Sequence, residues 1–337
     1  MKRNFNMVLA VLLFVFFSAS ARAGEAWYGD HKITGPYTHK NLSVYLVHGN
    51  DTAGAGDYMT LEEAMDSGLL KIYETGSVNN LRVQNKSKKK KIFIQSGDII
   101  RGGKQDRVIK HDMIINIYSG DVNIDVFCVE AGRWQKRGSE DAGYFSSSKL
   151  KISSRDLKLA ANSSESQQDV WNAVEDAQVK LEKNTGKSVR AGESSSSLLL
   201  TLENRDVDRL SNEYVEAIER AVSGQRDVIG FVFAINGEIN SGDIYASRTL
   251  FEKLWDKQIK ASAVEAVAEM DNGSKSLSPQ PSAIADWMNE ASLAQTRKQE
   301  IDNYNIGMEA DTDENLSYES YDAGAPSQYI HKSIIKK

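Results

Sequence analysis

The sequence predicts an α+β domain with a mostly antiparallel, β-rich N-terminal part packed with helices, followed by a β-hairpin, a long helix and a flexible tail. Three observations lead to this class. Short β-rich runs separated by turn residues fill the first part of the chain, helical periodicity dominates residues 153–222, and an Asn-Gly turn joins two β-rich runs after it. No repeat of about 20 to 50 residues is evident, which argues against a solenoid or a propeller.

Composition excludes several classes of protein. The chain has 337 residues, 41 basic and 47 acidic side chains, a formal net charge of −6 and 40% hydrophobic residues. Such a chain can bury a core without disulfide bonds, so small disulfide scaffolds and wholly disordered proteins are excluded. The acidic balance, with only one short lysine run, also argues against binding of duplex nucleic acid through its phosphates.

The first 23 residues have the pattern of a secretory signal peptide. Lys2 and Arg3 precede an apolar run over residues 7–17, and Ala21-Arg22-Ala23 gives the small-x-small pattern of a cleavage site. The alternative is a membrane anchor, but a spanning helix needs about twenty apolar residues. We expect cleavage after Ala23, which removes three bases and moves the net charge from −6 to −9. The product would be periplasmic or secreted, with no later membrane span.

We expect a single α+β domain over residues 24–270, which begins with strands and one short helix. Residues 42–47 and 69–73 have the β-rich composition of strands. Between them, Thr60 and Glu63 have the spacing of a capping box, so a helix should begin at Thr60 and end before Gly68.

A charged hairpin is predicted next. The short apolar runs 81–83 and 91–94 flank residues 85–90, which contain four lysines. The lysines suggest an anion-binding site, but the favoured interpretation is a solvated turn that also discourages edge-to-edge strand pairing.

A second hairpin is predicted from residues 113–118 and 122–129, because Gly120 between them can supply a positive φ. The single cysteine, Cys128, lies in the latter strand. Its position beside Glu130 suggests a nucleophile, but strand alternation places it on an apolar face, which favours a buried, inert thiol.

Helices and a third hairpin follow. Helical periodicity predicts helices over residues 153–161, 166–183 and 206–222, with Ser166 and Asp169 as a capping pair for the second of these. Residues 228–235 and 238–245 flank Asn236-Gly237, the preferred dipeptide of a type I′ turn. Because residues 228–235 are apolar on both faces, we expect this strand to lie centrally in a sheet covered on both sides.

The end of the domain is predicted to be a long helix. It should start at Ser247 and run to about Met270. Beyond it, residues 271–337 contain 11 acidic and 6 basic side chains and three of the four prolines, which predicts an acidic, largely disordered tail. One docked helix over residues 282–296 is the alternative for part of it. The tail's protein partner is unknown from the sequence.

The densest polar segment, residues 97–107, is the first candidate site. Paired glycines let backbone N–H groups converge on an anion, and the cationic and amide side chains that follow would add donors. The spacing is neither a P-loop nor a dinucleotide fingerprint, and a tight turn between strands explains the glycines as well. The candidate ligand-binding residues here are Gly102, Gly103, Lys104, Gln105 and Arg107, and Asp98 is a candidate general acid or base.

A second candidate segment follows residue 128. Glu130 offers a carboxylate, Arg133 a guanidinium fork and Trp134 a ring for stacking, at the point where a strand emerges into a loop. The five histidines show no metal-ligand spacing, so no metal site is predicted, and no cofactor is indicated.

Four segments carry a resemblance to a known family. They are Leu61-Glu62-Glu63-Ala64, Ser77-Val78-Asn79-Asn80-Leu81-Arg82-Val83, Gly102-Gly103-Lys104-Gln105-Asp106-Arg107-Val108 and Cys128-Val129-Glu130-Ala131-Gly132-Arg133-Trp134. In order and spacing they resemble the ARG and Rhodanese-Phosphatase-superfamily-associated Protein domain, and the likeness covers residues 41–268. That family usually has Gly-Glu-Glu before the glycine pair, whereas Asp98-Ile99 follows Gly97 here, so the second carboxylate is missing.

The resemblance gives a direction for function without establishing a reaction. The family is named for genomic association with ADP-ribosylglycohydrolases and rhodanese-like phosphatases, which implies a nucleotide-like, ADP-ribose- or NAD-related ligand. Our leading hypothesis is an exported domain that binds or processes such a ligand, with Asp98 or Glu130 as general acid or base. The alternative is a non-catalytic exported scaffold or protein-interaction module in which the same polar residues form a structural network.

Overall fold

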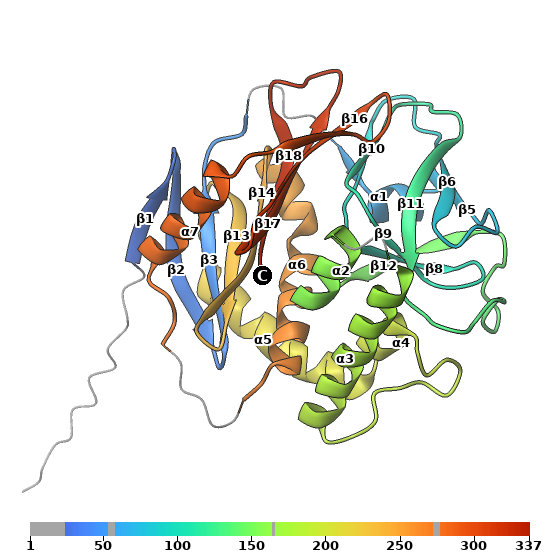
Figure 1. The fold of residues 1–337 in the computed structure, drawn as a ribbon, viewed down its shortest axis with the longest axis horizontal. Coiled ribbons are helices and arrows are strands. Elements are labelled where there is room, and N and C mark those ends of the chain that lie inside the picture. Colours follow the sequence, from blue (N-terminus) through green and yellow to red (C-terminus); the bar gives the residue numbers. More distant parts are fainter. Residues whose placement is uncertain (1–23, 53–57, 164–165, 272–276) are drawn as a thin grey trace, which may run out of the picture.

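The computed structural model describes residues 24–52, 58–163, 166–271 and 277–337. The expected signal peptide, residues 1–23, lies outside the described residues. The fold is α+β and mostly antiparallel, as predicted, with three sheets and a layer of helices. Figure 1 shows the nine-stranded sheet on one side of the molecule and the six-stranded sheet on the other, with α2, α3 and α6 between them.

The nine-stranded sheet has the order β1-β2-β3-β13-β14-β18-β17-β16-β15, and its neighbours are antiparallel. Its predicted hairpin, β13 to β14, is confirmed, and Asn236 and Gly237 have φ values of 53° and 82°, as a type I′ turn requires. The strands are β1 (Gly24–Tyr28), β2 (His31–His39), β3 (Leu42–His48), β13 (Val228–Ile235), β14 (Glu238–Tyr245), β15 (Arg297–Glu300), β16 (Asn305–Asp311), β17 (Asn315–Asp322) and β18 (Tyr329–Lys336).

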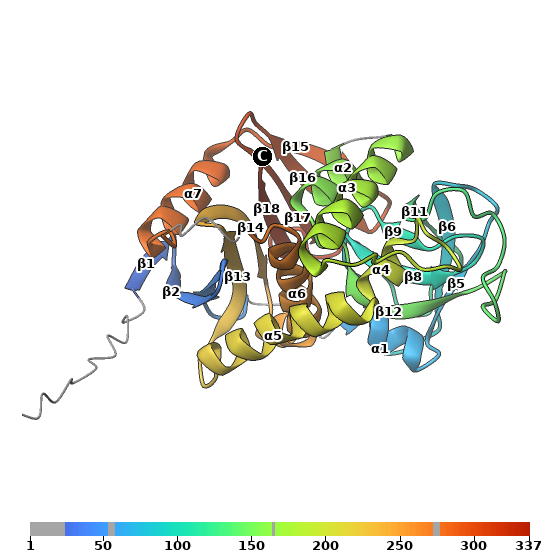
Figure 2. The same cartoon turned by 90° about the horizontal axis from the view of Figure 1, so that it is seen from below.

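Both faces of β13 are covered, which explains its continuous apolar run. Phe231 and Phe233 belong to the core shared with α5 (Arg205–Val222) and α6 (Arg248–Ala268), whereas Val232 belongs to a separate core shared with α7 (Pro281–Leu293). Figure 2 shows α7 and α5 on opposite sides of β2 and β13. The predicted central position of this strand is therefore confirmed.

The other two sheets differ from the predicted hairpins. The six-stranded sheet has the order β12-β8-β9-β11-β6-β5 and the three-stranded sheet the order β10-β7-β4. Thus β6 pairs with β11 and β7 with β10, so neither hairpin predicted between residues 81 and 129 forms. The strands are β4 (Met59–Thr60), β5 (Leu70–Tyr73), β6 (Asn80–Asn85), β7 (Ile92–Ile94), β8 (Asp98–Gly102), β9 (Arg107–Ile109), β10 (Met113–Ile115), β11 (Val122–Cys128) and β12 (Phe145–Lys151).

The predicted helices form close to their expected bounds. Helix α1 (Leu61–Asp66) has the capping box of Thr60 and Glu63, and Ser166 caps α3 (Gln167–Thr185) by accepting from the backbone N–H of Asp169. Helix α2 covers Arg155–Ser163, and α6 begins after its N-cap Ser247. The short helix α4 (Leu198–Leu202) was not predicted. No helix in the described ranges is long and apolar enough to cross a membrane.

The prediction of a largely disordered tail after residue 270 was wrong for residues 281–336. Helix α7 covers one face of the large sheet, and its Trp287 donates from Nε1 to Asn315 Oδ1 at 2.7 Å. Strand β18 lies between β14 and β17, with Ser241 facing Ile335. The C-terminal segment is therefore an integral part of the domain, which does not end at residue 270.

Candidate functional site

Two of the predicted loops meet at one end of the six-stranded sheet. Strands β8 and β9 form a hairpin in which Ile100 faces Arg107, so residues 102–106 lie in the turn between them. On the other side of β9, Arg107 faces Cys128 at the end of β11. Because β9 and β11 are antiparallel, the turn and the loop Glu130–Trp134 that follows β11 emerge at the same end of the sheet.

The paired glycines permit a close approach at this turn. Gly102 and Gly103 have φ values of 115° and 56°, and a Cβ on Gly103 would overlap Phe145. The N–H of Gly102 donates to Asp106 Oδ1 at 3.1 Å, and that of Gly103 to Asp141 O at 3.0 Å. Both backbone donors are thus used within the protein, so the donors for an anion at this site are side chains.

Three buried carboxylates lie behind the turn, and together with three arginines they form what we call the loop network. Asp106 Oδ2 accepts from Arg137 Nη1 at 2.9 Å, and Glu130 Oε2 lies 2.6 Å from Arg133 Nη2. The backbone N–H of Asp106 donates to Glu130 Oε2 at 3.2 Å and so joins the two carboxylates. The loop network consists of Glu74, Asp106, Arg107, Glu130, Arg133 and Arg137.

The surroundings of Asp106 and Glu130 shift the pKa values of their carboxyl groups in opposite directions. Burial and the negative charge of Glu130 raise the pKa of Asp106, although Arg137 opposes this. Burial also acts to raise the pKa of Glu130, but hydrogen bonds from Arg133 and Ser194 outweigh it and lower that pKa. Glu130 is therefore the stronger acid of the pair, and Asp106 retains its proton to a higher pH.

Arg107 is the least satisfied member of the network. Its side chain is 0% exposed, and its Nε and Nη2 have no hydrogen-bond partner among the described residues. Nη1 donates to Gln105 Oε1 at 3.2 Å and to Cys128 Sγ at 2.8 Å, while Nη2 lies 3.6 Å from Glu74 Oε2 as an ion pair. Buried donors without partners are rare in native proteins, so Arg107 calls for an additional acceptor.

Trp134 covers this arginine. Its ring centroid lies 5.7 Å from Arg107 Cζ and 4.9 Å from Lys104 Nζ, and the residue is 44% exposed. The ring therefore has an accessible surface for stacking while it lies next to a buried guanidinium. Gln105 is buried and donates from Nε2 to Glu130 O at 2.6 Å, so it holds the two loops together.

Asp98 does not lie with these residues. It begins strand β8, whose five residues place it about 13 Å from Gly102 along the strand. Its Oδ1 lies 3.1 Å from Lys257 Nζ of α6, and the buried Lys151 of β12 faces it across the strand pair. Asp98 and Glu130 therefore do not form a pair of catalytic carboxylates.

Asp98 belongs instead to a second buried network, which joins the two large sheets through α6. His331 of β18 is at its centre, with Nδ1 2.7 Å from Asp112 Oδ2 and Nε2 3.0 Å from Asp243 Oδ1. The ring of Tyr245 stacks on the imidazole at 4.6 Å. We call this the junction network, and it consists of Asp98, Asp112, Lys151, Asp243, Lys257 and His331.

The two aspartates keep His331 charged. Burial alone would lower the pKa of His331, but Asp112 and Asp243 raise it to about 9. Correspondingly, burial acts to raise the pKa values of Asp112 and Asp243, and their contacts with His331 lower both. The imidazolium thus balances two buried negative charges, as a buried ionic group requires.

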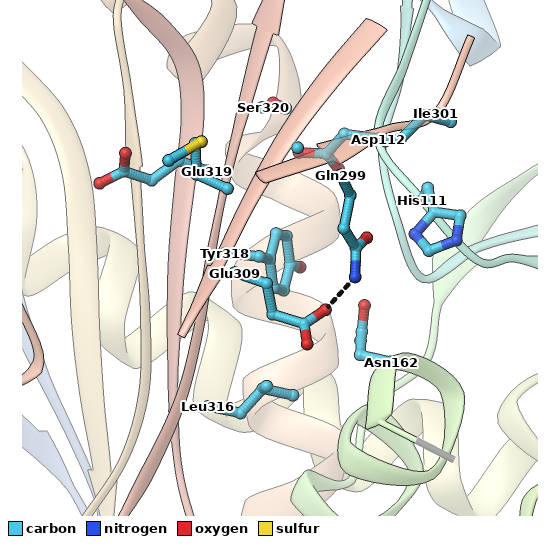
Figure 3. Close-up of a pocket in the computed structure, with 12 residues that line it drawn as sticks. His111, Asp112, Asn162, Gln299, Ile301, Glu309, Leu316, Tyr318, Glu319 and Ser320 are labelled. Carbon is cyan, nitrogen blue, oxygen red and sulfur yellow. Dashed lines mark hydrogen bonds between the residues drawn. The ribbon is translucent and has the colours of Figure 1, made fainter. Parts of the chain in front are cut away.

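A small cavity adjoins the junction network at Asp112. Figure 3 shows Asp112, Tyr318 and Asn162 around it, with His111 on one side and the hydrogen-bonded pair Gln299 and Glu309 nearby. Its volume is about 30 Å³, which is room for water but not for a nucleotide. This cavity is therefore not a candidate site for a ligand of nucleotide size.

Several members of the two networks were not predicted from sequence. Arg137 of the loop network, whose Nη2 lies 2.7 Å from Glu140 Oε1, follows Trp134 closely in the sequence, so a wider window there would have included it. Glu74 and His331 come from distant segments, and no local pattern marks them. Cys128 is buried as expected, and burial raises the pKa of its thiol to about 11, although Arg107 opposes this. Among the described residues, no three His, Cys, Asp or Glu side chains are grouped to hold a metal ion.

Fold and site together define an α+β domain with two buried ionic networks, one of them beneath surface loops. Comparison with known families matches residues 30–334 to the ARG and Rhodanese-Phosphatase-superfamily-associated Protein domain, and the chain belongs to this family. The matched range includes the C-terminal strands as well as both networks. No curated protein and no solved structure matches the chain.

Proposed function

We propose that this protein binds a nucleotide-like, phosphate-bearing ligand at the loops that carry Arg107 and Trp134. The observation that carries the proposal is the fully buried guanidinium of Arg107, whose Nε and Nη2 have no hydrogen-bond partner among the described residues. A phosphate that reaches these two N–H donors would supply their missing hydrogen-bond acceptors, because a guanidinium binds phosphate through two parallel N–H groups.

The neighbours of Arg107 support a ligand that combines a charge with a ring. Trp134 is half-exposed and offers a face for a base, and Lys104 lies over its ring. Arg133 Nε is also buried without a hydrogen-bond partner in the described part of the chain. Movement of the Trp134 side chain would open a path to Arg107, so ligand entry should change its environment.

If the ligand is also processed, the carboxylates of the loop network would take part in proton transfer. Glu130, with its lowered pKa, suits a general base, and Asp106, with its raised pKa, suits a general acid. Asp106 replaces Asp98 in this part of the proposal, because Asp98 pairs with Lys257 in the junction network.

A specific observation also favours the alternative of a non-catalytic scaffold or interaction module. The charges of the loop network largely pair among themselves: Asp106 with Arg137, Glu130 with Arg133, and Glu74 with Arg107. In this alternative the network fixes the loops on the sheet, and no small ligand completes it.

Thermal-shift measurements on the full chain distinguish the two. ADP-ribose, NAD, mononucleotides and pyrophosphate are tested; a ligand at 100-fold its Kd stabilises the fold by about 2.7 kcal/mol. Lys104→Ala should abolish the shift, whereas Lys149→Ala, which removes an exposed lysine elsewhere, should leave it unchanged. A flat screen with a folded protein contradicts the proposed ligand and favours the scaffold.

Tryptophan fluorescence gives an independent test of where the ligand binds. Trp134→Phe should remove the fluorescence change caused by the ligand, and Trp27→Phe, at another exposed tryptophan, should retain it. Equal changes in both variants would place the ligand elsewhere.

Export is the remaining part of the proposal, and the charged start and apolar run of residues 2–17 support it. N-terminal sequencing of the protein recovered from its natural source should begin at Gly24. A protein that retains residues 1–23 in the cytoplasm would contradict export.

A further inference from the structure

A second cavity, which shares no lining residue with the loop network, lies between the start of α2, the β13–β14 turn and the end of α6. Its volume is about 190 Å³, enough for a small organic molecule. Acidic and amide side chains dominate its wall. The wall residues used below are Arg155, Lys180, Asn236, Glu238, Glu265 and Glu269.

Glu265 is buried in this wall with one oxygen unsatisfied. The residue is 2% exposed, and its Oε1 accepts from the N–H of Arg155 at 2.7 Å and from Asn240 Nδ2 at 2.8 Å. Its Oε2 is buried and has no hydrogen-bond partner among the described residues. Lys158 Nζ lies 3.9 Å from that oxygen, beyond hydrogen-bond distance, and donates to Ser241 Oγ at 3.0 Å instead.

A second acceptor of the same cavity is also unsatisfied. Asn236 Oδ1 is buried without a hydrogen-bond partner in the described ranges, while its Nδ2 donates to Glu269 O at 2.8 Å. Two orphaned acceptors in one cavity, one of them on a carboxylate, require a donor that the protein does not supply.

The charge of the wall indicates what kind of donor fits. Lys180 is already paired with Glu269 at 2.6 Å and with Asp156 at 3.5 Å. Glu238 and Glu265 add two more negative charges, which are offset by Arg155 and by Lys158, the ion-pair partner of Glu265 Oε2 at 3.9 Å. Asp156 and Glu269 share Lys180 alone, so the wall keeps an excess of one negative charge. A neutral donor would satisfy the hydrogen bonds but would leave this charge uncompensated, so a cationic donor fits better.

We infer that this cavity is a binding site for a small organic cation with N–H donors, a primary ammonium or a guanidinium group, held by Glu265 Oε2 and Asn236 Oδ1. The ligand would donate one N–H to each orphaned oxygen and place its positive charge next to the Glu265 carboxylate. Any aliphatic part of the ligand would lie against Ile235, which also lines the cavity.

Titration of the full chain with n-butylammonium and methylguanidinium, followed by calorimetry and by thermal shift, tests the inference. At least one of the two should bind saturably, and which one binds identifies the cationic group. Tetramethylammonium, which is a cation without N–H donors, should not bind. Absence of saturable binding by both probes, or equal binding of tetramethylammonium, overturns the inference and leaves water as the occupant.

Matched variants locate the probe in this cavity. Glu265→Gln keeps an oxygen for Arg155 and Asn240 but removes the charge, and it should weaken binding at least tenfold. Glu216→Gln removes the same charge at an exposed position of α5 that does not line the cavity, and it should change binding less than threefold. Asn236→Gly retains a residue suited to positive φ and deletes the second acceptor, so it gives an independent loss of binding if Glu265→Gln does not fold. Binding that survives both Glu265→Gln and Asn236→Gly overturns the assignment.

Discussion

The loop network and the junction network are both buried and both built from carboxylates and cations, yet they differ in completeness. In the junction network, no side-chain atom of Asp98, Asp112 or His331 lacks a hydrogen-bond partner. In the loop network, two donors of Arg107 have no hydrogen-bond partner among the described residues, and the ring of Trp134 that covers this arginine is half-exposed.

This difference separates buried polar groups that stabilise the fold from buried polar groups that can still bind a ligand. A satisfied buried network fixes the arrangement of the elements that it joins, and removal of one member leaves its partners uncompensated. An incomplete network has already lost part of that stabilisation, and an incoming group can restore it. We therefore expect substitutions in the junction network to affect folding, and substitutions in the loop network to affect ligand binding more than folding.

The largest expected effect comes from removal of strand β18. A chain that ends at residue 328 lacks His331 and leaves β14 and β17 without their common neighbour. We expect it to be unfolded at 25 °C, as judged by circular dichroism and by loss of a cooperative melting transition. Removal of Lys337 alone, which lies beyond the last strand, is the control and should leave a folded protein. A folded chain that ends at residue 328 would contradict the central role of the junction network.

His331→Ala should give the next largest effect. It leaves Asp112 and Asp243 without their shared cation, and loss of one partner from a buried ionic group costs about 3–5 kcal/mol. Urea denaturation measures the change in the free energy of unfolding. His39→Gln, at a partly buried histidine whose Nε2 has no hydrogen-bond partner, should change stability by less than about 1 kcal/mol. Similar changes in the free energy of unfolding for the two substitutions would contradict a large contribution of the junction network to stability.

The protonation of His331 predicts a decline in stability at alkaline pH. Its folded-state pKa is raised to about 9, so its contribution is complete below about pH 6.5 and is lost as the pH rises through 9. The free energy of unfolding should fall by about 3 kcal/mol over this interval. On the acid side, the lowered pKa values of Asp112 and Asp243 make stability fall below about pH 4.

The variant His331→Asn tests the origin of this decline. His31, His39 and His111 have pKa values lowered chiefly by burial, so their folded and unfolded forms are both neutral well above pH 6.5. The variant should be less stable overall, but its stability should be nearly constant between pH 7 and 9. An alkaline decline of the same size in His331→Asn would assign it to another group.

The sequence predicted the turns that depend on local chemistry. The β13–β14 hairpin was correct because Asn236 and Gly237 themselves adopt the positive φ that closes the two strands. The predictions of the two earlier hairpins were wrong because the residues between the strands do not determine which strands pair with one another. Tyr118, and not Gly120, has the positive φ near the second predicted turn, and β11 continues to pair with β6 and β9.

The error in the C-terminal segment has a different cause. Its excess of acidic residues was interpreted as a sign of disorder. Four of the eleven acidic residues, Glu309, Asp311, Glu319 and Asp322, lie on strands β16 and β17, and α7 contacts β17. Ile330, Ile334 and Ile335 of β18 are buried, so a strand signal was present within the polar segment.

The two networks were predictable to different extents, because one depends on neighbouring strands and the other on long-range strand pairing. The turn with Arg107 and the loop with Trp134 follow strands that are neighbours in one sheet, so the segments singled out from sequence do lie together. His331 meets Asp112 and Asp243 only through long-range strand pairing, and no spacing along the chain encodes that contact. Local motifs thus identified Arg107, Glu130 and Arg133 of the loop network, whereas the fold brings Glu74 to them and assembles the junction network.

The smallest expected effect on stability comes from the glycine turn in front of the loop network. Gly103→Ala places a Cβ at a φ of 56° and against Phe145, which should cost about 1–3 kcal/mol. Gly120→Ala, where a Cβ would meet nothing within 4 Å, should cost less than about 0.5 kcal/mol. Both stability changes are measured by thermal unfolding, and the Gly103→Ala protein is then titrated with the nucleotide that stabilises the wild type.

The titration has two possible outcomes. If the turn only shapes the loop, stability falls and the Kd for the nucleotide is unchanged. If the turn positions Lys104 and Arg107 for the ligand, as we propose, Kd rises as well, and a rise without loss of fold would separate binding from stability in this network.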